Sequence, residues 1–443
     1  MAITFAAFPV RATQDQSRNP APAAQQAPAP SQPAASEVTP PPAQHTVTAY
    51  TLPPDLYKKA HDRARISFRL TLIGFVYGLI VYWLVLNLKL SARYRDWAEK
   101  FSARSFLQSL VFSPALLLTL AILTLPLDIY GEWIEKGFGI SVQSWASWAW
   151  DWVKAEFIGL VIGTILIWLL YWVIRRSPRR WWFYFWLVAL PIGIFLFFIG
   201  PWVIDPMFHK FEPLQQKDPA LTASLEQLER RVGENIPPDR MFWMGAGEKT
   251  TALNAYVTGI GASKRIVVWD TTIAKMSTPQ IVFVVGHETG HYALEHIPKG
   301  LAFFAVLLLI FFYLGYQSIG RVLSRWGERW ALRGLDDWAS LPALLLLLSI
   351  FGFVANPVSS AFSRHLEHQA DQFGLEATHG LTSDSGQVAA QAFQILGEVD
   401  LSDPDPNPLA VFLFYSHPTI PERIHFALTY DPWAHGGHGE FVR

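Results

Sequence analysis

The chain of 443 residues contains no cysteine, has a formal net charge of only -1 and lacks a basic tract. The absence of cysteine excludes disulfide bonds, thiolate zinc fingers and cysteine nucleophiles, and it leaves His, Asp and Glu as the strong candidate metal ligands. The near-zero net charge provides no field that would attract nucleic acid. We therefore expect no nucleic-acid partner, while the oligomeric state stays open.

Apolar residues, by contrast, are abundant. They form 51% of the chain, which contains 19 Trp and 31 Phe and has a mean hydropathy of +0.21, well above the range of ordinary soluble proteins. A helix needs about 20 apolar residues to cross a bilayer. Six uncharged runs meet this requirement: residues 70–88, 105–127, 157–174, 181–204, 301–320 and 338–363. The sequence thus predicts a mainly α, multi-pass membrane helical bundle, with the lipid bilayer as a partner.

The N-terminal segment has a different composition. Pro and Ala fill 16 of the 25 positions from residue 19 to residue 43. Such a segment buries too little apolar surface to offset its ordering entropy, so we expect residues 1–50 to form a disordered leader. The first 12 residues resemble either the tail of a signal peptide or an unstructured terminus, and both interpretations stay open.

The one long polar stretch, residues 205–300, contains the sequence H-E-x-x-H at His287, Glu288 and His291. On a helix, positions i and i+4 lie on the same face, so the two imidazoles can bind one zinc ion while the glutamate serves as the base. This pattern is typical of metalloproteases. The alternative is an amphipathic helix with coincidental polar residues.

Local patterns predict the elements around this motif. Apolar spacing predicts a helix over residues 219–232. Two short β-rich segments, residues 253–258 and 265–269, predict a pair of adjacent strands. A second helix is predicted from residue 278 to about residue 297, with its N-cap, first residue and stop signal at Thr278, Pro279 and Pro298.

A hydrolytic zinc site needs a third protein ligand. The metzincin class has Gly and His where this chain has Leu294 and Ile297, so that class is excluded. Glu367 and Asp371 lie four residues apart just after the last apolar run, so one can bind the metal while the other accepts a hydrogen bond from a ligating His. Asp371 could instead pair with Arg364. Two other candidate ligands are Glu295 and His296, but they are so close in sequence to His291 that their side chains cannot easily turn back to the same metal ion.

Four motifs in this order carry a family resemblance: L-N-A-Y-V-T-G at 253–259, H-E-x-x-H, the E-x-x-x-D of Glu367 and Asp371, and S-H-P-T-I-P-E-R at 416–423. Together they resemble the integral-membrane zinc metallopeptidases of the type I CAAX prenyl endopeptidase family, relatives of the HtpX proteases. The resemblance extends over residues 52–428. It implies a zincin-type (gluzincin) catalytic domain that contains a small β-sheet.

The resemblance also implies the site residues. One Zn2+ per chain would be bound by His287, His291 and Glu367. Glu288 would be the catalytic base, Asp371 would orient a ligating imidazole and His417 would lie near the substrate carbonyl. A peptide or protein substrate would lie along an edge strand, and the residues implied in substrate binding are Asn254, Ala255, Tyr256, Val257 and Arg423.

The sequence therefore predicts a membrane-embedded zinc metalloendopeptidase. A site-two-type intramembrane protease is one alternative, but residues 280–297 are too polar for a span and no Asp lies in the six runs. A transporter with a coincidental motif is the other, but transporters usually carry ionisable groups inside their spans. The eukaryotic enzymes of the family have seven membrane helices around a chamber. This chain has its Pro/Ala-rich segment instead of the first helix, so a closed chamber and a preference for prenylated substrates do not carry over.

The predicted organisation has five parts. They are the leader (1–50), a membrane region with four spans (51–204), the catalytic domain (205–300), two further spans (301–363) and a C-terminal catalytic segment with the third zinc ligand (364–443). We expect a multi-pass protein of a bacterial inner membrane. Lys and Arg number 13 on one side of the spans and 11 on the other, which does not decide the orientation. The resemblance favours a cytoplasmic catalytic domain.

Overall fold

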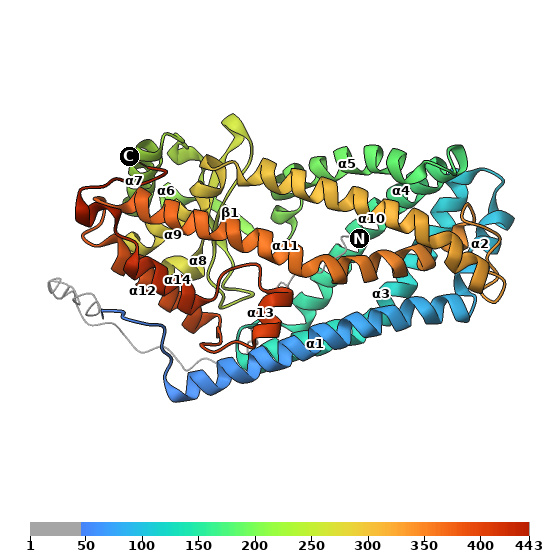
Figure 1. Ribbon diagram of the computed structural model, residues 1–443, viewed down its shortest axis with the longest axis horizontal. Coiled ribbons are helices and arrows are strands. Elements are labelled where there is room, and N and C mark those ends of the chain that lie inside the picture. The colour runs from blue at the N-terminus through green and yellow to red at the C-terminus, as the bar shows by residue number, and fades with distance from the viewer. Residues whose placement is uncertain (1–45, 443) are drawn as a thin grey trace, which may run out of the picture.

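The computed structural model describes residues 46–442. Long helices run along an elongated molecule, and a small sheet and several short helices gather at one of its ends (Figure 1). The last described residues lie at that same end. The predicted leader falls almost entirely outside the described residues.

Six helices within residues 46–442 are long and apolar enough to cross a membrane. They are α1 (Pro54–Asn87), α3 (Ser105–Phe138), α4 (Trp145–Arg176), α5 (Trp181–Val203), α10 (His296–Trp326) and α11 (Leu341–Thr378). The prediction of a six-span helical bundle is confirmed. Most of these helices extend beyond the apolar runs that predicted them, because their polar ends continue the helix outside the apolar zone.

Helix α11 links the membrane bundle to the polar end of the molecule. It has 38 residues, which corresponds to about 57 Å at 1.5 Å per residue. A span needs only about 20 residues, so its last turns project beyond the membrane. These turns carry Glu367 and Asp371 into the polar end.

The polar end contains a sheet of four strands in the order β1-β2-β4-β3. β1 (Lys210–Pro213) is antiparallel to β2 (Met241–Gly245), β2 is parallel to β4 (Arg265–Trp269), and β4 is antiparallel to β3 (Ala255–Thr258). The predicted pair of adjacent strands is confirmed as β3 and β4, with β3 at the edge of the sheet. Short helices also lie at this end: α6 (Leu214–Lys217), α7 (Pro219–Val232), α8 (Asp270–Lys275), α12 (Ser385–Val399) and α14 (Ile420–Thr429). Two other short helices are α13 (Pro408–Phe414), which packs on α11, and α2 (Leu90–Phe101), which packs on α3 at the opposite end of the molecule (Figure 1).

Helix α9 (Thr278–Ala293) carries the H-E-x-x-H motif, and both of its ends differ from the prediction. Its N-cap is Ser277, one residue before the expected cap, because Ser277 and Gln280 form a reciprocal capping box. The predicted stop at Pro298 is wrong. Glu295 adopts a left-handed conformation with φ 57°, which ends α9 and starts α10 at once. Pro298 then lies in the first turn of α10, where proline is tolerated.

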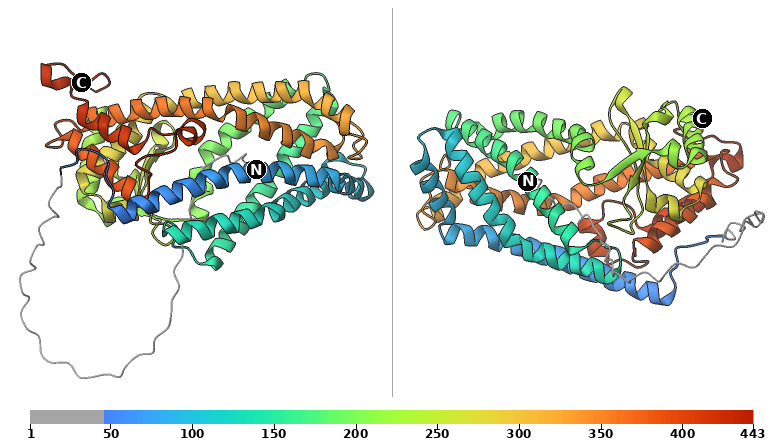
Figure 2. Two further views of the ribbon diagram at one scale, coloured as in Figure 1. Left: turned by 60° about the horizontal axis from the view of Figure 1, so that its bottom comes forward. Right: turned by 180° about the vertical axis from the view of Figure 1, so that it is seen from behind.

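The core of the polar end forms around α9. This helix packs against α7, the last turns of α11, α12 and β3. The apolar stripe predicted on α7 is fully buried against it, at Leu221, Leu225 and Leu228. Figure 2 shows from behind that the sheet and several helices gather at one end of the molecule. The motif is thus held from several sides by elements that are distant in sequence.

Candidate active site

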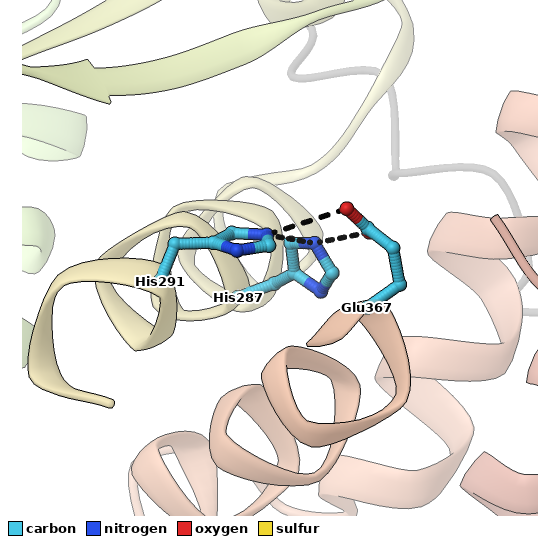
Figure 3. A group of neighbouring side chains, drawn as sticks. All are labelled: His287, His291 and Glu367. Atoms are coloured by element: carbon cyan, nitrogen blue, oxygen red, sulfur yellow. Dashed lines mark hydrogen bonds and ion pairs between the residues drawn. The ribbon is translucent and has the colours of Figure 1, made fainter. Parts of the chain in front are cut away.

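Helices α9 and α11 bring the three predicted metal ligands together. His287 and His291 project from successive turns of α9 toward Glu367 on α11 (Figure 3). The Nε2 atoms of the two imidazoles lie 3.2 Å apart. The carboxylate oxygens of Glu367 lie 3.2 Å from the Nε2 of His287 and 3.6 Å from the Nε2 of His291.

These three side chains fit a zinc ion. In a tetrahedral site with zinc–nitrogen bonds of about 2.0–2.1 Å, neighbouring ligand atoms lie about 3.3 Å apart. The ligand atoms of His287, His291 and Glu367 all lie within 4.8 Å of one another. Among the described residues, none donates a hydrogen bond of ordinary geometry to the buried Oε2 of Glu367, although the Nε2 atoms of His287 and His417 lie 3.2 and 3.3 Å from it. An oxygen whose partner is a metal ion would leave this pattern.

Two glycines permit the close approach of the helices. A Cβ atom on Gly374 of α11 would lie 3.1 Å from the backbone nitrogen of His287. A Cβ atom on Gly290 of α9 would lie 3.0 Å from the side chain of Phe373. The sequence reasoning missed both residues. The only available signal was a glycine within each of two helices that carry candidate ligands.

Asp371 holds the imidazole of His287. Its Oδ1 lies 2.8 Å from the Nδ1 of His287, and both of its oxygens accept hydrogen bonds from Arg423, at 2.9 and 2.6 Å. Burial lowers the pKa of His287, but its contacts with Asp371 and Glu367 outweigh this effect and raise the pKa to about 10. The alternative pair of Asp371 with Arg364 does not form, because Arg364 donates to backbone oxygens before the S-H-P motif.

His291 has a different environment. Burial lowers its pKa to about 3, so its imidazole is neutral and keeps a free lone pair for a metal. Its Nδ1 lies 3.1 Å from the Nδ1 of His296, the first residue of α10. From the sequence alone, His296 was considered as a candidate ligand and set aside because it lies too close to the motif. Its nearness to the site results from the break between α9 and α10.

Glu288 lies between the two ligands on α9 and is half-buried. Its enclosed position raises its pKa to about 7. A carboxylate with a pKa near neutrality is suited to accept and return a proton.

His417 comes from the loop between α13 and α14 and reaches the same cluster. Its Nε2 lies 3.3 Å from the Oε2 of Glu367, and its Nδ1 lies 2.9 Å from the hydroxyl oxygen of Ser416. If the hydroxyl donates to Nδ1, the Nε2 of His417 carries a proton and faces the ligand cluster.

The predicted substrate strand lies at the edge of the sheet as β3, next to α9. The carbonyl of Asn254 accepts a hydrogen bond from the backbone of Trp269 on the β4 side. Because hydrogen-bonded positions alternate along an antiparallel pair, the main-chain groups of Ala255 and Val257 face the open edge. Arg423 is engaged with Asp371 and stacks 4.2 Å from the ring of Phe393, so its contact with substrate stays a prediction.

Both halves of the chain match family models. Residues 34–210 match the CAAX prenyl protease N-terminal domain, described as five membrane helices, and residues 215–430 match peptidase family M48. The described part of the first range contains four candidate spans. A protein of Bacillus subtilis named uncharacterized metalloprotease YhfN is 38% identical, with 83% of this chain and 84% of the relative covered. The chain belongs to peptidase family M48.

Further relatives agree with this assignment. The CAAX prenyl protease 1 homolog of Dictyostelium discoideum is 27% identical, with 80% of this M48 peptidase and 79% of the relative covered. The crystal structure of S. mikatae Ste24p has a TM-score of 0.73 and 25% identity, with 88% of this chain and 93% of that chain covered. The predicted membrane metalloendopeptidase is confirmed and its polypeptide substrate follows from the activity. The family assignment favours it over the intramembrane-protease and transporter alternatives.

Proposed function

We propose that this M48 peptidase binds one Zn2+ per chain through His287, His291 and Glu367 and hydrolyses internal peptide bonds with it. The observation that supports this proposal is the convergence of three ligand atoms from α9 and α11 within 4.8 Å. A zinc ion bound there would supply a Lewis acid that activates water and polarises a peptide carbonyl.

The surrounding side chains carry the protons and the charge. The carboxylate of Glu288 takes a proton from the attacking water and returns it to the leaving nitrogen. His417 donates a hydrogen bond from Nε2 to the carbonyl oxygen as it gains negative charge. Asp371, held by Arg423, keeps the ring of His287 oriented through its Nδ1.

The substrate is proposed to bind as an added strand on β3. The main-chain groups of Ala255 and Val257 would pair with an extended peptide, and the neighbouring Asn254 and Tyr256 would flank it. Main-chain hydrogen bonds do not depend on the side chains of the substrate, so this mode of binding accepts peptides of many sequences. Some relatives are named CAAX prenyl proteases, but this mode of binding does not require a prenyl group.

The experiment is cleavage of an unfolded peptide library by the detergent-purified protein. We expect Glu288→Gln to lower kcat/KM by about 10²–10⁴-fold, because it removes the base, while zinc content stays at the wild-type level. The matched control is Glu328→Gln, the same change at an exposed position beyond the end of α10, and it should cleave normally. Wild-type rates for Glu288→Gln would contradict the assigned role.

The proposed location is a bacterial inner membrane with the catalytic end on the cytoplasmic side. The Bacillus subtilis relative supports the first part, and the family resemblance favours the second. The last described residues lie at the catalytic end (Figure 1), so the activity of a reporter fused to the C-terminus would report on which side of the membrane this end lies. Reporter activity outside the cytoplasm would refute this orientation.

A further inference from the structure

The two histidine ligands of the proposed zinc site have unlike partners. His287 presents its Nδ1 to the carboxylate of Asp371 at 2.8 Å. His291 presents its Nδ1 to another imidazole, that of His296, at 3.1 Å between the Nδ1 atoms. His296 is buried, and its Nε2 lies 3.1 Å from the Oε1 of Gln369. A chain of contacts therefore runs from His291 through His296 to Gln369.

These contacts join residues of three helices. The left-handed conformation of Glu295 lets the polypeptide backbone turn sharply after α9, so that the first residue of α10 lies beside His291, the last ligand of α9. Gln369 lies two residues after Glu367 on α11. The contact between His296 and Gln369 thus links α10 to the helix that supplies the third ligand.

The proton positions along the chain are determined by chemistry. If His291 binds a metal through Nε2, its neutral ring carries the proton at Nδ1, and this N–H donates to the Nδ1 of His296. His296 must then carry its own proton at Nε2. That N–H donates to the carbonyl oxygen of Gln369. Every donor in the chain faces an acceptor.

His296 is not placed to be a ligand itself. Its Nδ1 faces the Nδ1 of His291, which is the side of that ring opposite to the Nε2 that faces Glu367. It therefore lies behind His291 as seen from the ligand cluster. A residue in this place acts on the orientation and the tautomer of the ligand.

We propose that His296, supported by Gln369, is a positioning residue that fixes the tautomer and orientation of His291. This inference rests on the proposed function, because it assigns His296 a role in zinc binding by His291. Partners of ligating imidazoles typically change metal affinity by about 10–100-fold when they are removed. His296 would do for His291 what Asp371 does for His287.

The test is zinc affinity, measured by competition with a chelator in detergent. We expect His296→Phe, which keeps a flat ring but has no acceptor, to weaken zinc binding by about 10–100-fold. His296→Asn, whose side-chain oxygen offers an acceptor near the position of Nδ1, should recover most of the affinity. The control is His365→Phe, which changes an exposed His on α11 and should bind zinc normally.

A second variant guards against a folding defect. Gln369→Leu leaves His296 in place but removes its acceptor, so it should weaken zinc binding less than His296→Phe does. The metal-free variants should melt at the same temperature as the metal-free wild type. Wild-type zinc affinity in both His296→Phe and Gln369→Leu would overturn the proposed role of His296 and leave the proposed zinc site intact. A wild-type protein that binds no zinc would instead overturn the proposed function.

Discussion

Helices α9 and α10 follow each other in the chain, yet they are packed in opposite ways. Nine of the 16 residues of α9 are buried, whereas only four of the 31 residues of α10 are. α9 is enclosed by α7, α11, α12 and β3, while α10 packs mainly on α5 and α11. The candidate catalytic residues thus lie on the helix whose position is fixed from several sides. The membrane helix needs only apolar surface and length.

The largest difference between the two regions should come from buried charge. Arg423→Leu removes two charge-assisted hydrogen bonds from the buried carboxylate of Asp371 and leaves the imidazole of His287 as its remaining partner, so we expect a loss of about 3–5 kcal/mol in the free energy of unfolding. The matched change on α10 is Arg321→Leu. Arg321 is exposed, and its loss should change stability by about 0.5 kcal/mol or less. Denaturation of both metal-free proteins in detergent measures this, and equal losses would contradict the comparison.

The next effect depends on pH and concerns Glu229 of α7, which lies beneath α9. Its hydroxyl partner is Thr289, at 2.7 Å, and burial raises its pKa to about 7. The folded protein therefore keeps a proton that the unfolded chain has already lost, so the contribution of Glu229 to stability is lost as pH rises from about 4.5 through about 7. At 1.36 kcal/mol per pKa unit the cost reaches about 3 kcal/mol at alkaline pH.

Glu229→Gln should remove this cost. We expect the variant to gain thermal stability relative to the wild type as pH rises from about 5 to about 8, measured by the melting temperature at each pH. The control is Glu328→Gln, which changes an exposed carboxylate beyond the end of α10 and should follow the wild-type curve. A Glu229→Gln curve parallel to the wild-type curve would show that this carboxyl is not perturbed.

The smallest expected effect on stability comes from replacing a helical glycine by alanine, and it should differ between α11 and α10. Gly374→Ala places a methyl group 3.1 Å from the backbone of His287, and we expect overpacking to cost about 1–3 kcal/mol and to weaken zinc binding. Gly320→Ala on α10 meets nothing within 4 Å, so it should be neutral or stabilising by up to about 1 kcal/mol. Melting temperatures and zinc affinities of both variants provide the measurement. Equal melting temperatures and zinc affinities of the two variants would mean that α9 and α11 are not closely packed at Gly374.

The sequence predicted what depends on local pattern. Uninterrupted apolar length predicted the six spans, and four-residue spacing placed His287 with His291 and Glu367 with Asp371. Those spacings are properties of any helix, so they survive without knowledge of the fold. The strand pair that forms the edge of the sheet was equally visible, because its β-rich segments are separated by a short loop.

What the sequence could not predict depends on packing between distant segments. The break between α9 and α10 requires a left-handed Glu295, and no propensity indicates that conformation for glutamate. The contact of His296 with His291 follows only from that break. The fit of Gly374 against His287 joins residues 87 positions apart, and the partner of Asp371 proved to be Arg423 instead of the nearby Arg364.

Two imidazoles of α9 and one carboxylate of α11 form the proposed zinc site. Its most direct test is the metal content of the detergent-purified wild type and of Glu367→Gln, determined side by side by mass spectrometry. We expect one zinc per chain in the wild type and a large loss of zinc in Glu367→Gln, which keeps the shape of the side chain but removes its charge. A full complement of zinc in Glu367→Gln, held as tightly as in the wild type, would contradict this assignment.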